Sequence, residues 1–227
     1  MPQTLQDLVS VDDPAGPVLQ EWLGSGEVDA QVLGVEPERR DQCLLGLQVT
    51  LRSVLGAVAY ETGGILVDHG WLRLLGGGHE ALPSLYEALG LERATSAPGY
   101  VVLGWDVVGG VFALDGGGLR GAKGHVCYYA PDALQWEDLE FGYAEFVRWA
   151  LTGGLSTFAG DLRWEGWESQ TPLVPLDEVY LSDPPLWTLQ GQQIDEAERR
   201  HVRVDVLLAH QGEAAAAMGR PAGMRSD

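Results

Sequence analysis

Residues 99–155, GYVVLGWDVVGGVFALDGGGLRGAKGHVCYYAPDALQWEDLEFGYAEFVRWALTGGL, decide the fold. The stretch contains apolar segments rich in β-branched and aromatic residues, separated by glycine, proline and aspartate, and such segments predict short strands. We expect strands at residues 100–103, 110–114, 125–129 and 135–137. From Tyr143 to Ala150 apolar residues recur at helical spacing, and Gly153 ends the helix. This order predicts an α+β fold, an antiparallel sheet with helices packed mainly on one side.

The residues before this stretch predict further short elements. Thr4 is a suitable N-cap, and the Asp-Asp-Pro sequence at residues 12–14 suits the start of a second helix. The predicted helices cover residues 4–9, 12–23, 38–47 and 79–89, the last ended by Gly90. The predicted strands cover residues 31–35, 48–51 and 71–75. Two apolar segments, residues 55–60 and 65–67, flank Glu61-Thr62-Gly63-Gly64 and predict a hairpin.

The residues after position 155 predict a wrapping segment. A short helix is expected at residues 156–162, and four prolines between residues 172 and 185 predict irregular backbone. Further short helices are expected at residues 194–200 and 204–210. We therefore predict one α+β domain over residues 1–210, with its core at residues 55–155 and a wrapping segment at residues 156–210. The low-complexity residues 211–227 predict a disordered tail.

The composition excludes several classes of function. The 227 residues carry a formal net charge of -19, which repels nucleic acids and anionic membranes. A signal peptide and an apolar run long enough to cross a bilayer are both absent from the pattern, so a cytoplasmic location is expected. Cys43 and Cys127 are too few for a disulfide framework, and Cys127 lies in an apolar strand that predicts a buried thiol.

The candidate chemistry is sparse. Asp68, His69 and His79 are close in the sequence, and His125 and Cys127 are two apart on a predicted strand, so they share a face on which a metal ion could bind. The sequence contains no CxxC, HExxH or GxSxG motif. We therefore predict no catalytic residue, no cofactor and no metal. An enzyme, or a metal- or small-molecule-binding protein with a site near Asp68, His69 and His79, remains the alternative.

Two features suggest a contact surface instead. Trp105 lies in Gly104-Trp105-Asp106, a predicted turn in which an exposed aromatic beside an acid would suit protein binding; the other interpretation is a half-buried ring packed on its neighbours. Glu61 and Asp68 flank a short predicted hairpin. They could form a carboxylate pair in a cleft, or each could cap a turn. The predicted binding residues are Glu61, Asp68, His69, Trp71, His79, Trp105 and Asp106. Triple glycines at residues 76–78 and 116–118 predict turns, or a cleft for a small ligand.

Several long blocks carry a resemblance to known families. YETGGILVDHGWLRLLGGGH at residues 60–79, the central stretch, RWEGWE at residues 163–168 and PPLWT at residues 184–188 resemble a bacterial family known only as a domain of unknown function. The resemblance runs from about residue 5 to residue 207 and implies no activity. The strand and helix pattern of residues 99–155 is also similar to the SUKH superfamily of Smi/Knr-type proteins. Many bacterial members of that superfamily are immunity proteins that bind polymorphic toxins.

The SUKH resemblance implies a non-catalytic protein-binding module. Its partner would be a protein, such as a basic toxin, because a strongly acidic surface attracts a basic one. In this hypothesis aromatic anchors such as Trp105 supply affinity. The sequence does not determine the oligomeric state.

Overall fold

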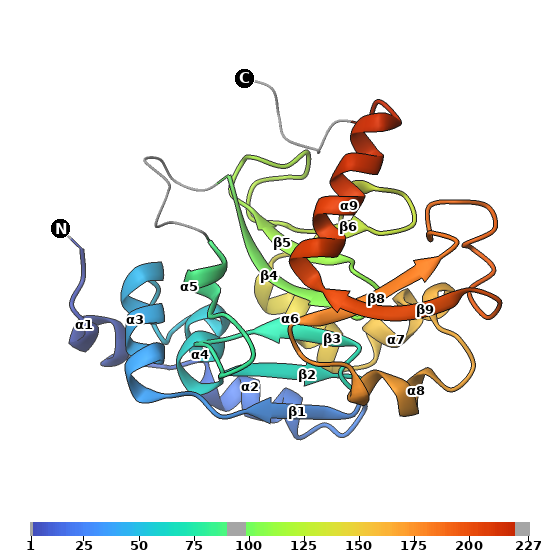
Figure 1. Ribbon diagram of the computed structural model, residues 1–227. Coiled ribbons are helices and arrows are strands. Elements are labelled where there is room, and N and C mark those ends of the chain that lie inside the picture. Colours follow the sequence, from blue (N-terminus) through green and yellow to red (C-terminus); the bar gives the residue numbers. More distant parts are fainter. Residues whose placement is uncertain (1, 90–98, 221–227) are drawn as a thin grey trace.

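A seven-stranded antiparallel sheet, whose strands are neighbours in chain order, organises the computed structural model, which describes residues 2–89 and 99–220 (Figure 1). The strands are β1 (Ala30–Leu33), β2 (Gly64–Val67), β3 (Leu72–Leu75), β4 (Tyr100–Asp106), β5 (Val111–Asp115), β6 (Val126–Ala130) and β7 (Gln135–Asp138). A separate two-stranded sheet consists of β8 (Glu178–Asp183) and β9 (Glu198–Arg203).

Helices surround this sheet. They are α1 (Leu5–Val9), α2 (Gly16–Leu23), α3 (Pro37–Leu47), α4 (Val54–Glu61), α5 (Leu85–Ala88), α6 (Tyr143–Leu151), α7 (Gly154–Phe158), α8 (Trp167–Gln170) and α9 (Val204–Ala217). Two 3-10 turns, η2 (Gly160–Leu162) and η3 (Thr171–Leu173), interrupt the C-terminal segment. The predicted α+β fold is confirmed.

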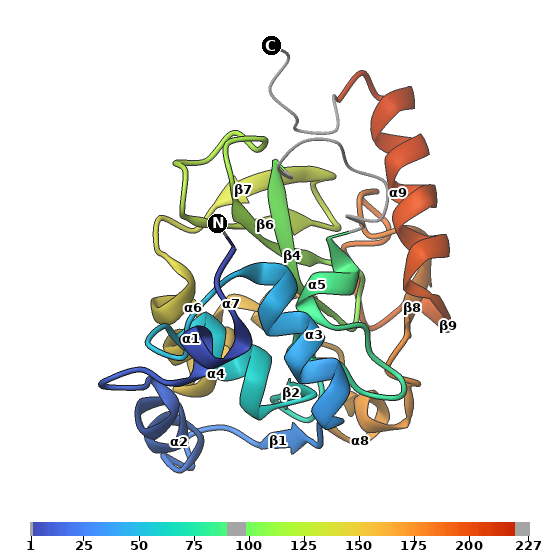
Figure 2. The ribbon, with the colours of Figure 1, turned by 90° about the vertical axis from the view of Figure 1, so that its left-hand side faces the viewer.

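The sheet is covered on both faces. In Figure 2, α6 lies to the left of β4, whereas α9, β8 and β9 lie to the right of it. Strand register assigns the side chains to these faces. Leu74 and Phe112 both pair with Gly104 of β4, and Phe112 packs against Phe146 of α6 with ring centroids 5.0 Å apart. The opposite face carries Trp71 and Arg73 and is packed against the C-terminal segment. Helices therefore cover one face, while the wrapping segment covers part of the other.

Helix α4 corrects the predicted hairpin. Residues 55–60 were expected to form a strand, but they are helical, and the Ser53 hydroxyl accepts a hydrogen bond from the Gly56 amide at 3.0 Å as the N-cap. The helix packs against α2, α3 and α6. Because apolar residues are needed almost all around such a helix, its sequence lacks the polar face that reveals an amphipathic helix.

Two other N-terminal predictions were wrong. Residues 48–51 form a turn rather than a strand, since Gln48 adopts a left-handed conformation with φ of 53° at the end of α3. Residues 79–89 were expected to be one helix, but only α5 is helical. Its capping box, formed by Ser84 and Glu87, starts the helix after Pro83, and His79 instead pairs with Leu82 in an isolated bridge. Gly90, the expected cap, lies outside the described residues.

The C-terminal segment is more regular than predicted. Residues 194–200 were expected to be helical, yet residues from Glu198 onward form β9, which pairs with β8 from Glu178↔Arg203 to Asp183↔Glu198. Charged residues along β9 have weak strand propensity, so pairing with β8 decides their conformation. Helix α9 begins at Val204 as predicted and continues through Ala217, past the expected end at His210. Among the residues described, no helix is long and apolar enough to cross a membrane.

The Phe112 side chain provides a test of the helix-covered core. It is fully buried and contacts the rings of Tyr128, Phe146 and Phe158. We expect Phe112→Ala to lower the free energy of unfolding by about 3–5 kcal/mol, because it removes buried apolar surface and leaves a cavity. Leu189→Ala, at a side chain that is 82% exposed, should change it by less than about 0.5 kcal/mol. Urea unfolding followed by tryptophan fluorescence measures both, and equal effects would contradict this packing.

Candidate functional site

The turn between β2 and β3 places Asp68 and His69 on the face covered by the C-terminal segment. Asp68, His69 and Gly70 have φ values of 55°, 57° and 76°, so three consecutive residues are left-handed. Only glycine adopts this conformation without cost, and aspartate and histidine tolerate it better than most residues. The turn closes with a hydrogen bond from the Trp71 amide to the Asp68 carbonyl at 2.9 Å.

The Asp68 carboxylate forms an ion pair with Arg163 of the C-terminal segment. Its Oδ2 accepts hydrogen bonds from Arg163 and from the Ser156 hydroxyl, the latter at 2.6 Å. The Arg163 guanidinium also lies over the ring of Trp167 at 3.9 Å and over that of Trp71 at 5.0 Å. This Asp68–Arg163 pair, enclosed by tryptophan rings, joins the β2–β3 turn to residues 156–167. The ion pair therefore links two parts of the fold, and Arg163 balances the charge of the Asp68 carboxylate.

Breaking this pair should destabilise the protein. Asp68→Asn leaves Arg163, whose side chain is 12% exposed, without its countercharge, and we expect a loss of about 3–5 kcal/mol in the free energy of unfolding. The control is Glu145→Gln, which removes the exposed pair with Arg148 and should cost less than about 1 kcal/mol. Adding Arg163→Met to Asp68→Asn should restore part of the loss, since no uncompensated charge remains. Urea unfolding of the wild type and the three variants tests this, and a double variant no more stable than Asp68→Asn would contradict it.

The prediction of an exposed Trp105 was wrong. Strand β4 continues through Asp106, past an irregularity between Val102 and Gly104, so residues 104–106 are not a turn. Trp105 is 5% exposed and lies beside Arg73 on the neighbouring strand. The sequence could not show this because the covering segment lies more than fifty residues further along the chain.

Asp106 is likewise a structural residue. Its Oδ1 accepts hydrogen bonds from the amides of Val108 at 3.0 Å and Gly110 at 2.8 Å, and the Tyr128 hydroxyl donates to Oδ2 at 2.6 Å. A Cβ at Gly110 would lie 2.2 Å from that hydroxyl oxygen, so only glycine fits beneath the pair. Burial raises the pKa of Asp106, although the hydrogen bonds and the charge of Arg73 act in the opposite direction.

This raised pKa has a consequence for stability. Between the ordinary carboxyl pKa of 3.8 and the raised value, the folded protein binds more protons at Asp106 than the unfolded chain does. The contribution of Asp106 to stability is therefore fully present below pH 3.8 and is lost as the pH rises through the folded-state pKa. We expect the free energy of unfolding of the wild type, relative to Asp106→Asn, to fall over that window. Urea titrations of both proteins from pH 3.5 to neutrality, roughly the range in which carboxyl groups titrate, measure this difference, and a constant difference would contradict it.

Glu61 and His79 lie elsewhere. Glu61 ends α4 beside Gly16, where a Cβ would come within 2.3 Å of its Oε1, and burial raises its pKa. The His79 carbonyl accepts a hydrogen bond from Arg39, and its Nδ1 accepts from the Ala81 amide at 3.3 Å. His79 therefore borders a groove with Arg39, whereas His69 borders a different cavity with Asp29. Of the predicted binding residues, the structure brings together Asp68, His69 and Trp71.

The His125 and Cys127 pair does not form a metal site with a third ligand. His125 Nδ1 lies 3.0 Å from Asp138 Oδ1, and within residues 2–89 and 99–220 no group of three His, Cys, Asp or Glu side chains is arranged to hold a metal ion. Cys127 is a buried thiol, as predicted, and burial raises its pKa to about 11. A thiol with this pKa is protonated at neutral pH and is a poor nucleophile.

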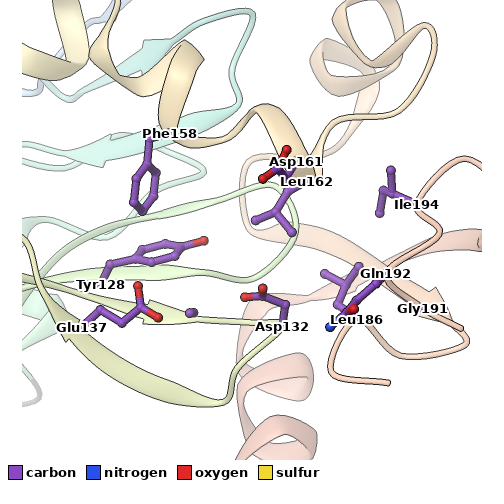
Figure 3. Close-up of a pocket in the computed structure, with 11 residues that line it drawn as sticks. Tyr128, Asp132, Glu137, Phe158, Asp161, Leu162, Leu186, Gly191, Gln192 and Ile194 are labelled. Atoms are coloured by element: carbon purple, nitrogen blue, oxygen red, sulfur yellow. The ribbon is translucent and has the colours of Figure 1, made fainter. Parts of the chain in front are cut away.

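A pocket of about 430 Å³ opens beside Tyr128 (Figure 3). Three carboxylates surround it: Asp132 follows β6, Glu137 lies on β7, and Asp161 lies in η2. The rings of Tyr128 and Phe158 form an aromatic wall, with their centroids 5.0 Å apart at an interplanar angle of 79°. Leu186 and Ile194 close the opposite side, which belongs to the wrapping segment.

The charge of this pocket is unbalanced. The 11 lining residues include no lysine, arginine or histidine. Burial raises the pKa of Glu137, and the nearby charge of Asp132 acts in the same direction. Carboxylates beside aromatic rings form an environment that favours a cationic group. We call Asp132, Glu137, Asp161, Tyr128 and Phe158 the acidic pocket.

The sequence did not reveal the acidic pocket because its residues come from four separate segments. Asp132 follows Pro131 and is typical of a turn, and Glu137 alternates along an edge strand as a solvent-facing residue would. The segment at residues 186–194 completes the pocket only because the chain folds back onto β6 and β7. The excess of acidic residues was the one signal in the sequence, but net charge does not show where on the folded protein those residues gather.

The structure is that of an α+β protein with an acidic pocket at its surface. The chain belongs to the family described as "Protein of unknown function DUF2625", whose model matches residues 5–207. It is 37% identical over 198 residues to "Putative uncharacterized protein YbfG" of Escherichia coli strain K12, covering 87% of this chain and 90% of that protein. It is 33% identical over 207 residues to an "Uncharacterized protein" of Haemophilus influenzae, covering 89% and 91%. No solved structure matches the chain. The predicted family of unknown function is thus confirmed, and the similarity to the SUKH superfamily remains a prediction.

Proposed function

We propose that this protein is a non-catalytic protein-binding module that receives a basic side chain of a partner protein in the acidic pocket. The observation that carries the proposal is the set of three carboxylates, Asp132, Glu137 and Asp161, around one pocket whose lining contains no basic residue. A lysine or arginine side chain entering the pocket would gain charge-assisted hydrogen bonds from the carboxylates. Its aliphatic stem would pack against Phe158 and Leu162.

The charge of the whole chain supports the same partner. A net charge of -19 creates a negative field that speeds the approach of a basic protein and repels acidic ones. The pocket volume of about 430 Å³ exceeds what one side chain fills, so a loop of the partner could enter together with its basic residue. Trp105 is buried and is not part of this surface, so the anchor is the pocket rather than an exposed tryptophan.

A toxin-immunity role is the specific form of this proposal. The resemblance of residues 99–155 to the SUKH pattern motivates it, since immunity proteins act by covering a toxin surface. Under this role the partner is a basic toxin, and the complex is held in part by a desolvated contact between its cationic side chain and the acidic pocket.

Pull-downs from the native host test the proposal. The pocket variant Asp132→Asn/Glu137→Gln/Asp161→Asn should lose most of the partner that the wild type recovers, because three carboxylates around the contact are neutralised. The matched control is Glu21→Gln/Glu27→Gln/Glu213→Gln, which removes the same charge at three exposed side chains away from the pocket. We expect the control to recover the partner at near wild-type level, and recovery to fall at high salt.

Two results would contradict the proposal. Recovery of no protein at either low or high salt would exclude a stable protein partner under those conditions. Equal loss with the pocket variant and the control variant would show that net charge alone, and not the acidic pocket, holds the partner.

A further inference from the structure

Arg73 is a buried cation that no carboxylate of the described residues contacts. It lies in β3, is 1% exposed, and within residues 2–89 and 99–220 neither its Nε nor its Nη1 has a hydrogen-bond partner. Its Nη2 reaches only the Val174 carbonyl, at 3.5 Å. No carboxylate in the described part of the chain lies within 4.0 Å of its nitrogens, although nine other ion pairs satisfy that limit.

The charges of Asp106 and Asp177 favour the charged form of this guanidinium, but neither carboxylate forms an ion pair with it within 4.0 Å. Asp106 belongs to the opposite face of the sheet and is committed to Tyr128 and two backbone amides. Asp177 is half exposed and lies 4.0 Å from Arg203. Burial lowers the pKa of Arg73 to about 10, so the side chain is still charged at neutral pH. A buried charge without a partner is costly to the fold, and this cost decreases when an anion binds.

A small cavity adjoins Arg73. Its volume is about 120 Å³, and Leu66, Val174 and Leu176 give it an apolar wall. Thr171 also borders it; this residue is 1% exposed and its hydroxyl has no hydrogen-bond partner. The cavity therefore adjoins two buried side chains with polar atoms that no described residue pairs, one side chain cationic and one able to donate a hydrogen bond.

We propose that this cavity binds a small monocarboxylate, with its oxygens on Arg73 and Thr171 and its short aliphatic part against Leu66, Val174 and Leu176. One negative charge matches one guanidinium, whereas a phosphate dianion would leave excess charge beside an apolar wall. A water molecule occupies about 30 Å³ of liquid, so the cavity suits an anion of only a few non-hydrogen atoms. Asp29 at the rim opposes anion entry, but its side chain is 57% exposed and solvent screens it.

Titration calorimetry of the full chain with propionate tests this inference. We expect saturable binding with one site per chain, no detectable binding of propionamide, and phosphate at least about tenfold weaker than propionate, because a neutral amide and a dianion each lack the matching charge. Arg73→Met should weaken propionate binding at least about tenfold. This variant should fold, since replacing a buried unpaired cation with an apolar side chain of similar length is neutral or stabilising.

Further variants separate this site from the acidic pocket and from general charge effects. Thr171→Val keeps the cation and should weaken propionate binding several-fold through the lost hydrogen bond. The pocket variant at Asp132, Glu137 and Asp161 should bind propionate as the wild type does, so the two proposals can fail independently. Absence of saturable propionate binding, equal binding of propionamide, phosphate binding as tight as that of propionate, or unchanged binding by Arg73→Met would each overturn the inference.

Discussion

The ion pair between Asp68 and Arg163 is the interaction on which the arrangement of the molecule depends. It connects a tight, left-handed turn of the sheet to a segment almost a hundred residues later, and the rings of Trp71 and Trp167 enclose the guanidinium. Buried pairs of this kind add little net stability compared with apolar packing, but losing one partner is costly because it leaves a buried charge uncompensated. Here the pair lies where the wrapping segment begins to cover the face of the sheet that carries Trp71 and Arg73.

Both candidate binding features follow from that placement. Once the wrapping segment crosses the sheet, Asp161 and residues 186–194 face the end of β6 and β7 and complete the acidic pocket (Figure 3). The same segment brings Thr171 and Val174 over Arg73 and encloses the smaller cavity. A single docked segment thus creates two sites of opposite charge, one with three unpaired carboxylates and one with an unpaired guanidinium. Of these charges only Arg73 is buried, and because folded chains usually pair a buried charge, its cavity marks a place where a ligand can supply the missing one. Glu137 and Asp161 are exposed, so the acidic pocket rests on the clustering of like charges and not on burial.

The sequence predictions were accurate where a residue's conformation depends on its neighbours in the sequence, and they failed where it depends on tertiary contacts. Thr4 was recognised as an N-cap because its partner, Asp7, is three residues away. Helix α6 was recognised because its buried and exposed faces alternate at helical spacing. Helix α4 and strand β9 were missed, since the first is apolar on nearly every side and the second is charged along its length. In those two elements tertiary packing overrides local preference.

The sequence by itself determined the α+β class, the strands of the central stretch, the acidic charge and the family, because each depends on composition or on local periodicity. It also placed Asp68, His69 and Trp71 among seven predicted binding residues. Only the tertiary structure decided that Asp68 is neutralised, that Trp105 is buried, and that Arg73 and three distant carboxylates lie unpaired beside cavities. The physical reason is that charge pairing and burial depend on which segments meet across the sheet, and those meetings involve residues tens of positions apart.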